Sequence, residues 1–84
     1  MKNIYVGNLA FSTTEQSIRA LFEPFGRVQH VTLMTDRFTG HSRGFAFVEM
    51  ADDETAAHAM AELNGCTVDS RVLRVHQARA RAGR

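Results

Sequence analysis

The stretch RGFAFV, residues 43–48, combines one cation with two phenylalanines at alternating positions. In a β-strand, successive side chains alternate, so one face would carry Arg43, Phe45 and Phe47. Burying an unpaired arginine is costly, and this predicts that the shared face is open to solvent. Aromatic rings stack on nucleic-acid bases and arginines bind phosphates. The spacing therefore favours a surface that binds single-stranded nucleic acid.

The hydrophobic pattern predicts the elements that position this strand, in the order strand, helix, strand, strand, helix, strand. We expect strands over 2–7, 28–35, 43–50 and 71–77, one helix from about Glu15, and a second helix capped by Asp52 or Asp53. Pro24 and Gly26 should end the first helix, and the second should end near Leu63. Thr13 with Gln16 fits a capping box at the first helix, with Thr14 as a competing cap.

This order is the ferredoxin-like, split βαβ pattern of an α+β fold. Two helices can cover only one face of such a sheet, and this leaves the other face for binding. We expect the helix-facing set to be aliphatic or small: Ile4, Val6, Val31, Leu33, Ala46, Val48, Leu73 and Val75. The opposite set mixes rings, cations and polar groups: Tyr5, Thr32, Met34, Arg43, Phe45, Phe47, Glu49, Arg74 and His76. Residues 66–70 could form a short hairpin arm, and Gly7 and Gly26 are assigned to turns.

Composition limits the classes of protein that remain. The chain has 84 residues, a net charge of +1 and a single cysteine, so an internal disulfide and a thiolate metal cluster are excluded. No apolar run approaches a membrane span, and the first residues do not resemble a secretory signal. We therefore expect a cytoplasmic protein of one domain over 1–78, followed by a short arginine-rich tail over 79–84.

Two motifs carry a resemblance to a known family. The hexamer IYVGNL at 4–9 and the octamer RGFAFVEM at 43–50 resemble the two ribonucleoprotein motifs of the RNA recognition motif family. The resemblance implies a four-stranded antiparallel sheet backed by two helices. It further implies that Tyr5 and Phe47 each stack on a base, Phe45 packs against sugars and Arg43 contacts a phosphate. Met50 departs from the aromatic preference of the octamer, but alternation points it towards the helices.

The remaining site residues surround this aromatic group. Met34 is expected at the edge of the surface, and Arg74, His76 and Gln77 lie where the last strand leaves the sheet. Arg79 and Arg81 in the tail are interpreted as an accessory phosphate clamp. The length of the chain also resembles that of the small single-domain RNA-binding proteins of bacteria.

The favoured hypothesis is a monomeric, non-catalytic module that binds single-stranded RNA in post-transcriptional RNA handling. Single-stranded DNA stays open as a ligand, and we expect no cofactor, no metal and no membrane partner. The four histidines are too scattered for a metal site. Three alternatives remain: a protein-interaction module on the same fold, a small enzyme such as an acyl-phosphate hydrolase, and dimerisation through the open face. The loop after the first strand lacks the basic residue that the enzyme would need.

Overall fold

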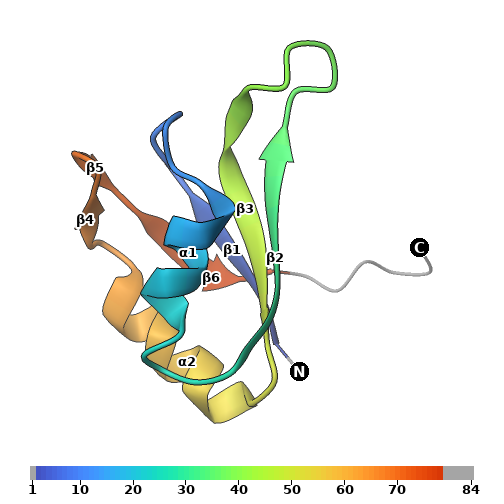
Figure 1. Cartoon of the computed structure of the whole chain (residues 1–84). Helices are drawn as coiled ribbons and strands as arrows, with labels where there is room; N and C mark the ends of the chain where they lie inside the picture. The colour runs from blue at the N-terminus through green and yellow to red at the C-terminus, as the bar shows by residue number, and fades with distance from the viewer. Residues whose placement is uncertain (1, 79–84) are drawn as a thin grey trace.

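The computed structural model describes residues 2–78, which form a βαββαβ arrangement with one added hairpin. The elements are β1 (Lys2–Gly7), α1 (Glu15–Phe22), β2 (Val28–Thr35), β3 (Ser42–Met50), α2 (Asp53–Leu63), β4 (Thr67–Val68), β5 (Arg71–Val72) and β6 (Arg74–Gln77). Four strands pair antiparallel in the order β2-β3-β1-β6, while β4 and β5 pair with each other. Both helices lie on the same side of the sheet (Figure 1). The predicted ferredoxin-like α+β fold is confirmed.

The core lies between the sheet and the helices and follows the predicted alternation. All eight predicted helix-facing residues are buried except Leu33, which is partly buried and packs against the core. The helices contribute Ile18, Phe22, Ala56, Ala59 and Leu63. Met50 is also fully buried, so its departure from the family octamer concerns packing on the helix side. Within residues 2–78 no helix has the length and apolar character needed to cross a membrane.

Helix α1 begins at a different cap from the first one predicted. The Thr14 side chain accepts a hydrogen bond from the Ser17 amide at 3.1 Å, and Ser17 Oγ accepts one from the Thr14 amide at 3.0 Å. The capping box predicted for Thr13 and Gln16 is therefore wrong, because the competing Thr14 is the cap. Thr13 is instead buried and donates its hydroxyl to Asp69 at 3.0 Å.

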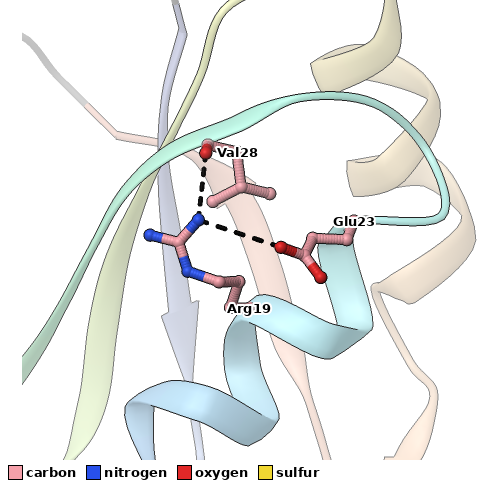
Figure 2. A network of polar contacts seen from close by, with 3 residues as sticks. All are labelled: Arg19, Glu23 and Val28. Carbon is pink, nitrogen blue, oxygen red and sulfur yellow. Dashed lines mark hydrogen bonds and ion pairs between the residues drawn. The ribbon is translucent and has the colours of Figure 1, made fainter.

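The end of α1 is held against the start of β2. The helix ends at Phe22, just before Pro24, and Arg19 reaches from its last turn to the next strand. Arg19 Nη1 donates to the Val28 carbonyl at 3.0 Å and lies 3.9 Å from Glu23 Oε2 (Figure 2). The exposed ion pair contributes little to stability. The hydrogen bond to the backbone fixes where β2 begins relative to the helix.

The predicted last strand over 71–77 is divided in the structure. Asp69 and Ser70 both have positive φ angles, 52° and 68°, and form a tight turn that lets β5 fold back on β4. The expected hairpin arm is thus present, but it takes residues 71–72 from the last strand. Asn8 anchors this hairpin to β1, because its Nδ2 donates to the Val72 carbonyl and its Oδ1 accepts from Arg71, both at 2.6 Å.

Candidate functional site

Three aromatic rings form a cluster on the sheet face that the helices leave open. Tyr5 lies directly opposite Phe47 in the register of β1 and β3, and Phe45 lies opposite Gly7. The centroid of the Tyr5 ring is 5.8 Å from that of Phe45 and 6.0 Å from that of Phe47. Phe45 and Phe47 are also 6.0 Å apart and nearly perpendicular. All three are half-buried, so the rings support one another and still present surface to a ligand.

The position of the Tyr5 ring depends on a glycine two residues along the same strand. A Cβ atom built on Gly7 would lie 2.6 Å from Cε1 and 2.7 Å from Cζ of Tyr5, closer than real side chains allow. The ring therefore lies over Gly7, and His76 stacks beside it at 4.7 Å with an interplanar angle of 19°. Gly7 is the last residue of β1 and does not adopt a positive φ. Its assignment to a turn is wrong, because the glycine provides space for the ring.

Cations gather at one end of the aromatic cluster. The guanidinium carbon of Arg43 lies 5.5 Å from the Phe45 ring centroid, within the range of a cation–π contact. Arg74 lies opposite Gly7 on β6, so both arginines are near the Phe45 end of the face, and both are exposed. Glu49 lies towards the opposite end of β3, opposite Asn3. This polarity would draw an anionic backbone towards the Arg43 end.

The structure brings most of the predicted site residues together. Seven of them lie on the open face: Tyr5, Met34, Arg43, Phe45, Phe47, Arg74 and His76. Gln77 lies opposite Ile4, so alternation along β6 places it towards the helix side, where it is exposed at the sheet edge. Arg79 and Arg81 fall outside the described residues. The roles of all these residues in binding remain predictions.

Two exposed phenylalanines were missed by the sequence reasoning. Phe11 in the β1–α1 loop and Phe38 in the β2–β3 loop are 80% and 90% exposed. Loops have no hydrophobic period, so the only signal for either residue was an aromatic side chain among polar loop residues. Among residues 2–78 no group of three or more histidine, cysteine or acidic side chains could hold a metal ion.

Comparisons with known proteins agree with this geometry. A model described as RNA recognition motif matches residues 4–74. RbpD of Nostoc sp., whose name includes the words RNA-binding protein, is 49% identical over 78 residues, which cover 93% of this chain and 83% of that protein. The crystal structure of the RNA-binding protein PG1 has a TM-score of 0.94 and 42% identity, covering 96% of this chain and 98% of that one. The RRM of Rna15 with bound RNA (GU) has a TM-score of 0.82 and 36% identity, covering 90% of this chain and 81% of that one.

Proposed function

Because the chain belongs to the RNA recognition motif family, we propose that it binds single-stranded RNA across the open face of its sheet. The observation that carries the proposal is the cluster of Tyr5, Phe45 and Phe47 on the face that no helix covers. Each ring offers an apolar surface to a base or sugar, and stacking is tolerant of sequence because every base has a π-face. The related RRM of Rna15, solved with bound RNA (GU), supports RNA as the ligand.

Each side chain takes a role that its position supports. Tyr5 and Phe47, opposite each other on neighbouring strands, stack on one base each. Phe45 packs against the sugars between them, and exposed Arg43 contacts a phosphate at the same end. Two or three stacked bases, offset by the cost of ordering the strand, correspond to a dissociation constant of about micromolar order. The module is non-catalytic and acts in post-transcriptional RNA handling in the cytoplasm.

The other predicted residues border this surface and have lesser roles. Met34 on β2 and Arg74 on β6 extend it on either side, and His76 supports the Tyr5 ring by stacking. Gln77 contributes from the sheet edge where β6 ends. Arg79 and Arg81 follow β6 in the chain and supply further positive charge for phosphates.

The proposal is tested by fluorescence anisotropy of short, unstructured RNA pools titrated with the protein. Saturable binding at low salt is expected, and a single-stranded DNA pool of equal length measures how strongly the surface depends on the 2′-hydroxyl. If the folded protein binds no RNA pool even at low salt, the proposed function is wrong. That result would favour the alternative that the domain binds a protein partner.

The phosphate contact of Arg43 can be distinguished from aromatic stacking by the salt dependence of RNA binding. Each phosphate that a protein neutralises on a single strand contributes about −0.7 to the slope of log K against log salt. Replacing Arg43 by glutamine is therefore expected to make the slope less steep by about 0.7 and to weaken binding most at low salt.

The matched control is Arg27→Gln, which removes the same charge far from the surface. Arg27 is exposed before β2, and its carbonyl accepts from the Ala51 amide beyond the other end of β3. Its slope should stay close to that of the wild type. Equal changes in slope for Arg27→Gln and Arg43→Gln would show that RNA binding depends only on net charge. This result would contradict the proposed contact between Arg43 and a phosphate.

A further inference from the structure

A hollow lies beyond the Arg43 end of the aromatic cluster, between the β1–α1 loop and the β2–β3 loop. Figure 1 shows the β2–β3 loop extending past the end of the sheet, away from the helices. The hollow is lined by one aromatic ring and five polar or charged residues: Phe11, Asp36, Thr39, His41, Ser42 and Arg43. Neither the family motifs nor the proposed stacking surface includes this lining, apart from Arg43.

The Phe11 side of the hollow is held by an ordered loop. Leu9 and Thr13 on either side of Phe11 are buried, and the Leu9 amide donates to the Gly44 carbonyl at 2.8 Å. The Thr13 amide donates to the Ala10 carbonyl at 3.1 Å and closes the turn that contains Phe11. Single exposed apolar side chains are common on proteins. The significance of Phe11 comes from its place in a preformed hollow beside the cationic end of the stacking surface.

The opposite wall is also fixed by hydrogen bonds within its own loop. Asp36 Oδ1 accepts from the amides of Phe38 at 2.8 Å and Thr39 at 3.0 Å, and the Asp36 carbonyl accepts from Gly40 at 2.8 Å. The Asp36 amide donates to the His41 carbonyl at 2.8 Å. The hydrogen bond from the Phe38 amide, followed by that from the Thr39 amide, holds the pKa of the Asp36 carboxyl below its usual value. Little ordering is then needed when a ligand enters.

Arg43 joins the hollow to the stacking surface. Arg43 is one of the residues that line the hollow, and its guanidinium carbon lies 5.5 Å from the Phe45 ring centroid. A strand that crosses Phe45 and continues past this cation reaches the hollow directly. A nucleobase suits the mixed lining, because it presents a π-face to an aromatic ring and polar edges to hydroxyl, carboxylate and imidazole groups.

We propose that this hollow binds the base of one further nucleotide of the same RNA strand, stacked on Phe11 and contacted at its edge by the β2–β3 loop. This inference rests on the proposed function and extends the bound strand beyond the sheet. It assigns a binding role to Phe11 and gives none to Phe38, although both rings are exposed and Phe38 does not line the hollow.

The test compares Phe11→Ala with Phe38→Ala by anisotropy, using a trinucleotide pool and a heptanucleotide pool. Phe11→Ala should weaken binding of the heptanucleotides by about fivefold or more, the lower end of the contribution of one stacked base. Its affinity for trinucleotides, which the sheet alone can accommodate, should stay within about twofold of wild type. Phe38→Ala should leave both affinities within the same range. Both variants should fold, because neither ring contributes to the core.

Two results would overturn the hollow as a base site. One is an unchanged affinity of Phe11→Ala for heptanucleotides, and the other is an equal loss in Phe11→Ala and Phe38→Ala, which would indicate diffuse contact by the loops. Phe47→Ala in the same assay separates this failure from that of the proposed function. If Phe47→Ala loses affinity while Phe11→Ala does not, the sheet binds RNA and only the hollow is rejected.

Discussion

Replacing Phe47 by alanine is expected to weaken binding of short single-stranded RNA by about 1–3 kcal/mol, the contribution of one base–aromatic stack. The ring lies in the middle of the open face, opposite Tyr5 on one neighbouring strand and Thr32 on the other. It points away from the core that Phe22 and Met50 fill. The variant should therefore stay folded. Fluorescence anisotropy measures its RNA affinity, and a circular dichroism melt measures its folding.

The control for Phe47→Ala is Phe38→Ala, which removes the same side chain from an exposed loop position away from the aromatic cluster. Phe38→Ala should bind the trinucleotide pool as the wild type does. If folded Phe47→Ala binds that pool with unchanged affinity, the open face is not the binding surface. If Phe47→Ala proves unfolded, Phe47→Leu keeps an apolar side chain and still removes the aromatic face needed for stacking.

Gly7→Ala is expected to lower RNA affinity indirectly, because it displaces the neighbouring Tyr5 ring without removing it from the protein. The new Cβ atom would occupy space taken by the Tyr5 ring, so the ring must leave its stacked position beside His76. Losing one productive stack corresponds to about 1–3 kcal/mol of binding free energy. Gly7 has no positive φ, so alanine suits the backbone and the main effect falls on the ring. Nuclear Overhauser contacts between the Tyr5 and His76 rings report the displacement, and anisotropy reports the affinity.

A double-mutant cycle isolates this effect from any general damage to β1. In a Tyr5→Ala background the ring is absent, so adding Gly7→Ala should produce little further loss of affinity. An additive loss in the double variant would mean that Gly7 acts through the backbone or through direct contact with RNA. Unchanged ring contacts in the single variant would also contradict the account.

Much of the fold follows from patterns that the sequence displays openly. Alternation along β3 and β6 separates an aliphatic side from an aromatic and cationic side, and the unfavourable burial of Arg43 indicates which side is open. The end of α1 just before Pro24 and an aspartate cap for α2 follow from local chemistry that the sequence alone shows. The structure then identifies Asp52, rather than Asp53, as that cap. These signals are local, and they were sufficient to predict both helices and the four-stranded sheet.

The features that could not be predicted depend on contacts between segments distant in the chain. Residues 71–72 have strand character, but the sequence does not indicate that they pair with β4 rather than continue into β6. This pairing depends on the tight turn at Asp69 and on the contacts that Asn8 makes with residues 71–72. The role of Gly7 becomes visible only when the Tyr5 ring is seen to lie over it. Phe11 gains significance only because the β2–β3 loop closes a hollow beside it. Sequence periodicity carries no information on any of these arrangements.

The most direct test of RNA binding on this face uses the intrinsic fluorescence of Tyr5. The protein has one tyrosine and no tryptophan, so tyrosine emission reports on the aromatic cluster alone. A base that stacks on the ring changes its environment, and titration with unlabelled trinucleotides should change the emission saturably. The midpoint should agree with the dissociation constant measured by anisotropy. RNA binding detected by anisotropy with no change in tyrosine emission would show that RNA binds elsewhere and would contradict the central claim.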